Sequence, residues 1–241
     1  GSTVFSDYGF QIHYRDKDCD IIYVSPAHMT KWGEIMPVSR RMELIHYAGT
    51  HGSLIIEDDF ENEFVYLQKP TPSLYSLSGG HGVIYIGSFS RLLLPSIRLS
   101  FMVLPPALTE KYRQLADHYN QTASKAEQIA LCQFIRDGHL ASQTRRLRRL
   151  YSQKTKILVQ EIHDIFGKNS QIQLGAAGTS LTLTVSCRFS GNELKKKALA
   201  RGMRLNILRE EPDNLTLLLS GSSMASEKFR PALQLLKEIL E

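Results

Sequence analysis

The chain has 241 residues, 42% of them hydrophobic, which is enough to bury one large core or two modest ones. No run approaches the roughly 18 uninterrupted apolar residues of a membrane-spanning helix, and no segment has the features of a signal peptide, so we expect no membrane partner. The net charge of +5 at pH 7 is compatible with a nucleic-acid partner but too small to predict one.

The three cysteines are far apart in the sequence and none forms a C-x-x-C pair. This pattern argues against zinc or redox work and predicts reduced thiols in a cytoplasmic protein. His28 and His139 each stand alone, without metal-ligand spacing. No metal site is therefore predicted, and a structural role is the simpler interpretation of both histidines.

The first part of the chain alternates short apolar runs with amphipathic stretches. Runs of this length, bounded by turn residues, are typical of buried strands, and they cover 21–24, 54–56, 83–86 and 99–104. Between the first two, residues 38–51 place apolar side chains at helical spacing. Strand, helix and strand with short joints predict a mostly parallel sheet with helices on both faces.

Polar turns follow three of these predicted strands, at Ser25–Met29, Asp58–Phe60 and Ser88–Arg91. Ligands of open α/β sheets bind at the carboxyl ends of the strands. The three turns therefore predict a binding site at one edge of the sheet. A plainer interpretation of Asp58 and Asp59 is that they cap a turn, and Arg98 could pair with a surface carboxylate.

The pattern changes after about residue 107. Long helical patterns cover 108–134 and 142–166 and are broken near Asp137-Gly138, and a last helix is predicted at 226–240. Two β-type segments, 180–185 and 215–219, flank a helical pattern at 193–201. We therefore expect a sheet domain over residues 1–107 and a smaller α+β domain, with its connecting helix, over 108–241.

The segment from Tyr85 to Arg98 reads Y-I-G-S-F-S-R-L-L-L-P-S-I-R. It resembles the lysine-bearing segment of fold-type I pyridoxal-phosphate (PLP) enzymes, most closely that of MocR/GabR-type transcriptional regulators. In that family a lysine forms a Schiff base with PLP, and Arg91 stands at its position. A guanidinium stays protonated in proteins and is a poor nucleophile, so covalent PLP binding is not expected.

Three further segments resemble the same family in the same order: 25–28, 55–64, and 134–140 with 145–151. The resemblance thus covers nearly the whole chain. It implies the fold-type I aminotransferase-like fold, with part of the large sheet domain and the small α+β domain. It also implies a GntR-family, MocR-type regulator that forms a homodimer and binds DNA only through an N-terminal domain absent from this sequence, so we expect a fragment.

Matched residue by residue, the resemblance implies that Asp58 pairs with the pyridine nitrogen of PLP. It also implies that Ser88, Ser90 and Arg98 hold the phosphate, and hydroxyls with a guanidinium at this spacing suit an anion. The family's Gln after His28 is Met29 here, and its Tyr that contacts the ring hydroxyl is Phe60. Both departures remove polar contacts to the same corner of the cofactor as the change at Arg91.

The resemblance, together with these departures from it, implies a catalytically inactive effector region that senses an amino-acid-like or phosphate-bearing small molecule, or that only dimerises. The alternatives are an active PLP-dependent aminotransferase that uses another lysine, such as Lys31, and a scaffold with an empty pocket. We further expect Arg91 to fill the pocket and pair with Asp58.

The basic run Arg145–Arg149 lies on a predicted amphipathic helix and is most simply a solvated face, with nucleic-acid contact as the alternative. No helix-turn-helix pattern is found, so sequence-specific DNA binding by this chain is not expected.

Overall fold

The computed structural model describes residues 4–6, 9–11, 19–29, 34–59, 71–93, 95–119, 122–167, 170–175 and 178–241. The contacts divide the described chain into two compact units. The first holds the residues up to Ser142 except Glu34, and the second holds Gln143–Glu241 with Glu34. The contacts therefore divide the chain inside helix α5 (His139–Phe166), whereas the domain boundary at 107/108 stays a prediction.

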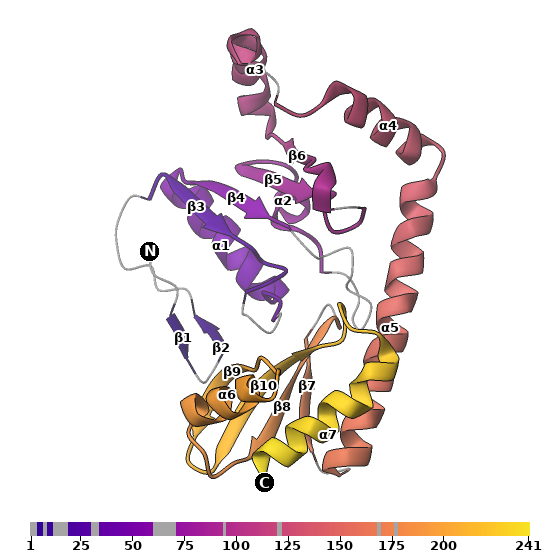
Figure 1. Ribbon diagram of the computed structural model, residues 1–241. Coiled ribbons are helices and arrows are strands. Elements are labelled where there is room, and N and C mark those ends of the chain that lie inside the picture. The colour runs from indigo at the N-terminus through magenta and orange to yellow at the C-terminus, as the bar shows by residue number, and fades with distance from the viewer. Residues whose placement is uncertain are drawn as a thin grey trace. The chain divides into compact units, whose positions relative to one another are not determined.

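The first unit is built on a four-stranded sheet in the order β3-β4-β5-β6. Its strands are β3 (Ile21–Val24), β4 (Leu54–Asp58), β5 (Val83–Ser88) and β6 (Ser100–Val103). The first three are parallel, and β6 runs antiparallel to β5 (Figure 1). All four apolar runs of the sequence are thus strands, and the predicted mostly parallel sheet is confirmed.

Helices α1 (Val38–His51) and α2 (Leu74–Leu77) connect the parallel strands. Helix α1 ends at Gly52, whose φ of 67° is a left-handed conformation that glycine adopts without a steric penalty. Both helices pack on one face of the sheet, where the buried core consists of Met36, Leu44, Ala48, Ile55, Leu74 and Val83. In the described residues this core has helices on one face, whereas the sequence pattern predicted helices on both.

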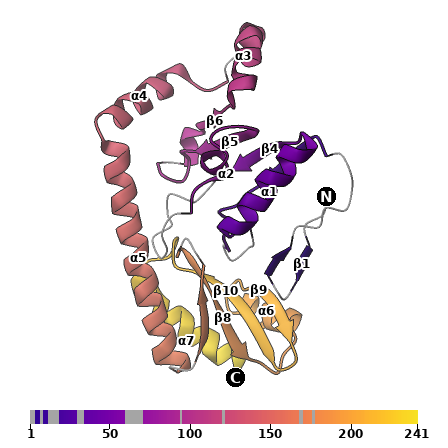
Figure 2. The ribbon, with the colours of Figure 1, turned by 180° about the vertical axis from the view of Figure 1, so that it is seen from behind.

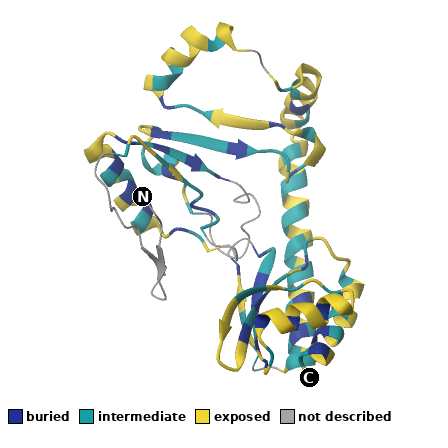
Figure 3. Cartoon of the chain, turned by 60° about the vertical axis from the view of Figure 1, so that its left-hand side comes forward, coloured by how far each residue is buried: buried dark blue, intermediate teal, exposed yellow. Residues whose placement is uncertain are grey.

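The second unit has an antiparallel sheet in the order β7-β8-β10-β9. Its strands are β7 (Gln171–Leu174), β8 (Ser180–Ser186), β9 (Asn206–Glu211) and β10 (Asn214–Ser220). Helices α6 (Gly191–Ala200) and α7 (Phe229–Leu240) lie against one face of it (Figure 2). Figure 3 shows the buried residues gathered between these helices and the sheet. This is the α+β arrangement that the sequence predicts.

Two parts of the secondary structure differ from the sequence prediction. The helix expected over 108–134 is two helices, α3 (Pro106–Leu115) and α4 (Lys125–Arg136), with a short 3₁₀ turn at Ala116–His118. The break occurs because Ser124 caps α4 and accepts a hydrogen bond from the backbone N–H of Glu127 at 3.4 Å.

The sequence analysis also missed the outer strands β7 and β9 and the hairpin of β1 (Val4–Ser6) and β2 (Gly9–Gln11). Further 3₁₀ turns lie at Pro95–Ile97 and Ser226–Lys228. Within the described ranges, none of the helices combines the length and the apolarity that crossing a membrane requires.

Gly87 of β5 lies opposite Phe101 of β6, and the aromatic ring covers the glycine. A Cβ atom at Gly87 would lie 2.4 Å from Cζ of Phe101. The same ring contacts Phe89 and Tyr85, with centroid distances of 5.2 and 6.1 Å. Only glycine therefore leaves room for the Phe101 ring to lie against the backbone of β5 at residue 87.

Replacing Gly87 with Ala should lower the free energy of unfolding by about 1–3 kcal/mol, because the methyl group forces the Phe101 ring out of its place. Urea denaturation of the chain measures this. Gly49→Ala is the matched control, since a Cβ atom at Gly49 meets no atom within 4 Å and alanine favours the helix by up to about 1 kcal/mol. Equal losses in the two variants would contradict the packing argument.

Candidate functional site

The carboxyl ends of β3, β4 and β5 lie at the same edge of the first sheet, because the three strands are parallel and in register. Val24 pairs with Glu57, and Asp58 pairs with Ile86. The three turns that the sequence analysis singled out follow these ends. Such an edge is where ligands of open α/β sheets bind, so it is the candidate site.

Three consecutive carboxylates lie at the end of β4: Glu57 and Asp58 are its last residues, and Asp59 follows it. Successive side chains of a strand point to opposite faces. Glu57 therefore points under the helices with Ile55 and is only 1% exposed. Asp58 points to the other face, and Asp59 returns to the first, where it is 4% exposed. The alternation gives the three acids three different environments.

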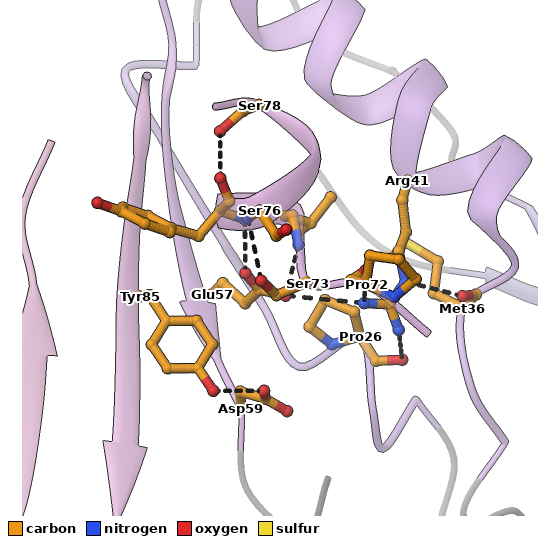
Figure 4. Close-up of polar contacts among 12 residues, drawn as sticks. Pro26, Met36, Arg41, Glu57, Asp59, Pro72, Ser73, Ser76, Ser78 and Tyr85 are labelled. Carbon is orange, nitrogen blue, oxygen red and sulfur yellow. Dashed lines mark hydrogen bonds and ion pairs between the residues drawn. The ribbon is translucent and has the colours of Figure 1, made fainter. Parts of the chain in front are cut away.

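Glu57 accepts two backbone hydrogen bonds from the start of α2, which Figure 4 shows. Leu74 N donates to Oε1 and Tyr75 N donates to Oε2, both at 2.9 Å. A helix N-terminus has N–H groups without partners and a partial positive charge. A carboxylate accepts hydrogen bonds from these groups and is attracted by the charge. Glu57 thus fixes the chain that returns to β5.

Arg41 of α1 lies beside Glu57, with Nη1 at 3.8 Å from Oε1, and is 2% exposed. Its guanidinium donates to three backbone carbonyls: Nε to Met36 at 3.0 Å, Nη1 to Pro72 at 3.0 Å and Nη2 to Pro26 at 3.2 Å (Figure 4). Only a guanidinium offers donors in so many fixed directions. Arg41 therefore ties together the turn after β3, the entry to α1 and the entry to α2.

Burial is the main influence on both charges. It raises the pKa of Glu57, while the N–H donors of Tyr75 and Leu74 and the charge of Arg41 act in the opposite direction. Burial lowers the pKa of Arg41, which the carboxylates of Glu57 and Asp59 oppose. A guanidinium stays protonated in proteins, so the pair is a buried cation with its carboxylate partner.

Two tyrosines hold the two aspartates. The Tyr23 hydroxyl of β3 donates to Oδ2 of Asp58, and the Tyr85 hydroxyl of β5 donates to Oδ2 of Asp59 at 2.6 Å. The hydrogen bond to Asp58 is the largest cause that raises the pKa of Tyr23, followed by burial. Among the described residues the partner of the Asp58 carboxylate is therefore Tyr23, and the predicted Arg91–Asp58 pair is wrong.

The Arg91 side chain is exposed, so the expectation that it fills a pocket is also wrong. It lies in the turn after β5, where Leu92 is the buried neighbour that anchors the backbone. The half-buried His28 has a lowered pKa, first because of burial and second because of the positive charge of Arg91. The charge of Arg91 thus acts on the turn after β3.

Ser88 is the last residue of β5, and its Oγ accepts a hydrogen bond from the backbone N–H of Ser90 at 3.3 Å. Phe89 N donates to the carbonyl of Leu99 at 3.0 Å, which brings the backbone of Arg98 beside this turn. Arg98 is exposed and has a φ of 49°, a left-handed conformation that is uncommon for a residue with a side chain. Anion binding by Ser88, Ser90 and Arg98 stays a prediction.

A cavity of about 620 Å³ lies next to this turn. Residues of the β5–β6 connection and of α4 line it, and Arg98 and Arg136 contribute two guanidinium groups to its wall. The apolar part of the wall comes from Phe89, Phe101, Leu131 and other side chains. An open cavity with apolar walls and two cations suits a small anionic ligand with an apolar body.

The remaining predicted residues are placed as follows. Met29 is half-buried and packs against the core under α1, so its side chain serves the core. Phe60 and Lys31 lie outside the described residues. Within the described ranges, no group of three or more His, Cys, Asp or Glu side chains gathers as metal ligands would.

Sequence reasoning missed Arg41, Tyr23 and Tyr85 and did not assign Glu57 a role. A signal for the buried pair was present, because Arg41 lies three residues before Leu44 and seven before Ala48, on the apolar face of α1. Glu57 likewise has the same strand parity as Ile55. A charged residue at a core position of both elements indicates a buried ion pair.

Replacing Arg41 with Met should lower the free energy of unfolding by about 3–5 kcal/mol, because it leaves Glu57 as a buried charge without its cation. Thermal and urea denaturation measure the loss. The control is Arg40→Met, next in sequence, whose exposed pair with Glu43 is worth less than about 1 kcal/mol. Similar stabilities of the two variants would show that the buried pair contributes little.

No family model matches the chain. The chain is 33% identical over 227 residues to the uncharacterized HTH-type transcriptional regulator YdeL of Bacillus subtilis, which is 92% of this chain and 49% of YdeL. It is 33% identical to the probable rhizopine catabolism regulatory protein MocR of Rhizobium meliloti, over 79% of this chain and 39% of MocR. The chain spans about half the length or less of these curated relatives.

Solved structures show the fold. The α-aminoadipate aminotransferase LysN of Thermus thermophilus matches 90% of this chain with a TM-score of 0.70 and 23% identity, over 58% of its own length. The kynurenine aminotransferase of Pyrococcus horikoshii matches 92% of this chain with a TM-score of 0.72 and 19% identity, over 57% of its length. The chain is therefore a homologue of the MocR-type transcriptional regulators and has the fold of type I aminotransferases.

Proposed function

We propose that this chain is the effector region of a MocR-type regulator and that it does not carry out transamination. The observation that carries the proposal is Arg91, which stands where the resemblance places the Schiff-base lysine. A lysine amine can lose its proton and attack an aldehyde, whereas a guanidinium remains protonated. The region would then act by binding a ligand or by holding two subunits together.

The described residues fit PLP only in part. Asp58 would hold the pyridine nitrogen, and Ser88, Ser90 and Arg98 would hold the phosphate. When bound, PLP withdraws electrons from an amine joined to its aldehyde carbon. No described side chain at the strand ends offers an amine for that carbon, and Met29 packs in the core. We therefore propose non-covalent binding of PLP or of another phosphate-bearing, amino-acid-like molecule.

The exposed position of Arg91 supports a ligand-binding role. Its charge reaches His28 across the strand ends, so an anion entering this edge would meet Arg91 and Arg98. A guanidinium binds carboxylate or phosphate oxygens in a bidentate manner. Homodimer formation and DNA contact by a separate domain of the whole regulator belong to the same proposal and follow from the family relationship alone.

The first test replaces Arg91 with Lys. If the rest of the site is intact, the variant should gain the visible absorbance of a PLP Schiff base, and borohydride should fix the cofactor to residue 91. Arg91→Gln is the control and should stay colourless. The unchanged chain should show no covalent label. A label on another lysine of the unchanged chain would instead support the alternative of an active aminotransferase.

The second test follows the ring protons of His28 by NMR as the pH changes. The midpoint should lie below the ordinary value of about 6.5. The contribution of His28 to the stability of the folded state is then fully present above the unfolded-state value of about 6.5, and it is lost as the pH falls through the folded-state pKa. Arg91→Gln should raise the midpoint only in part, because burial is the larger cause. Arg98→Gln should leave the midpoint unchanged. If Arg91→Gln also leaves it unchanged, the charge of Arg91 does not act on His28.

A further inference from the structure

A stripe of cations runs along helix α5 in the second unit. We define the basic stripe as Arg145, Arg146, Arg149 and Lys156, all exposed. Spacings of three, four, seven and eleven residues bring side chains to one face of a helix. The stripe extends over about 16 Å, at about 1.5 Å per residue. Ser142 and Gln153 lie on the same face and are exposed, so the stripe contains no acid.

The side chains of the stripe have no acidic partner among the described residues, whereas several arginines elsewhere do. Arg40, Arg113, Arg201, Arg209 and Arg230 each form an ion pair with a glutamate or aspartate. Among the described residues, none of the stripe side chains takes part in such a pair. The acids further along α5, Glu161 and Asp164, are bound by Arg230 at 2.8 and 3.0 Å. Four positive charges therefore stay uncompensated on one surface.

Helix stability does not account for the stripe. Cations stabilise a helix in its last turn, where the dipole is negative, but these begin in the second turn of a helix that ends at Phe166. The opposite side of α5 packs on the core through Leu158 and Ile162. The stripe is thus held in a fixed direction on a rigid element and displayed to solvent.

We propose that the basic stripe contacts the phosphate backbone of duplex DNA without reading its sequence. Duplex DNA carries one negative charge for about each 1.7 Å of its axis, so a stripe of about 16 Å spans several phosphates. Guanidinium groups suit phosphate oxygens. The choice of DNA rests on the proposed function, since a regulator's effector region works close to its operator.

The absence of sequence reading follows from the position of the stripe. A recognition helix places its first residues into the major groove with the support of a second helix. The stripe instead lies along the side of a long helix whose other side is buried. Such a surface can track the backbone and cannot enter the groove.

The test measures binding of the 241-residue chain, without PLP, to a labelled duplex of random sequence by fluorescence anisotropy. Four neutralised phosphates predict that the logarithm of the association constant falls with the logarithm of salt concentration with a slope of about −3.6. The variant R145Q/R146Q/R149Q/K156Q should lose most of this slope and weaken binding at low salt by more than about tenfold. Circular dichroism checks that the variant is folded.

The control K111Q/K195Q/K196Q/K228Q removes the same number of charges from exposed lysines elsewhere and should retain most of the slope. Equal weakening in both variants would show that net charge alone is responsible and would overturn the proposal. So would stripe-dependent binding to phosphatidylserine vesicles that is tighter than binding to DNA, or preference for one duplex sequence. Because the PLP test of Arg91→Lys does not involve the stripe, either proposal can fail while the other stands.

Discussion

The ion pair of Arg41 and Glu57 is the interaction on which the candidate site depends. Each partner is almost fully buried, and each also binds backbone groups that belong to other segments. A buried charge without partners is strongly unfavourable, so the segments that supply these partners must stay together. Because both buried charges need these partners, the strand ends and the helix entries are held in a fixed arrangement.

The alternation of side chains along β4 explains how neighbouring acids serve different purposes. Glu57 supports the fold from beneath the helices, while Asp58 is presented on the other face with Tyr23. A tyrosine that occupies one carboxylate oxygen leaves the second one available and fixes its direction. The Tyr23–Asp58 hydrogen bond therefore fixes the direction of the carboxylate.

Much of the fold could be predicted from the sequence, because the strands of the first sheet are short apolar runs and α1 carries apolar residues at helical spacing. The outer strands were not predicted, because β9, for example, ends in Arg209, Glu210 and Glu211 and, within the described ranges, pairs only with β10. The break between α3 and α4 depended on the cap at Ser124, which a purely apolar pattern does not register.

The candidate site was predictable only in its location. The sequence indicated the strand ends and, by resemblance, Arg91 as a position of interest, but not where the guanidinium would point. That direction depends on how the turn after β5 is anchored at Leu92 and on which partners the carboxylates already have. The burial of Arg41 was not predicted, because charged residues are seldom fully buried and an exposed position is the default expectation for any arginine.

The first sheet also has consequences for how the chain behaves in solution. Strands β3 and β6 are its outer strands, and they carry exposed apolar side chains at Ile21, Tyr23, Phe101 and Met102. On their outward sides no strand pairs with them among the described residues. Such an edge is a template for adding another strand. We therefore expect a tendency to edge-to-edge self-association that rises with protein concentration and that a lysine placed on β3 hinders.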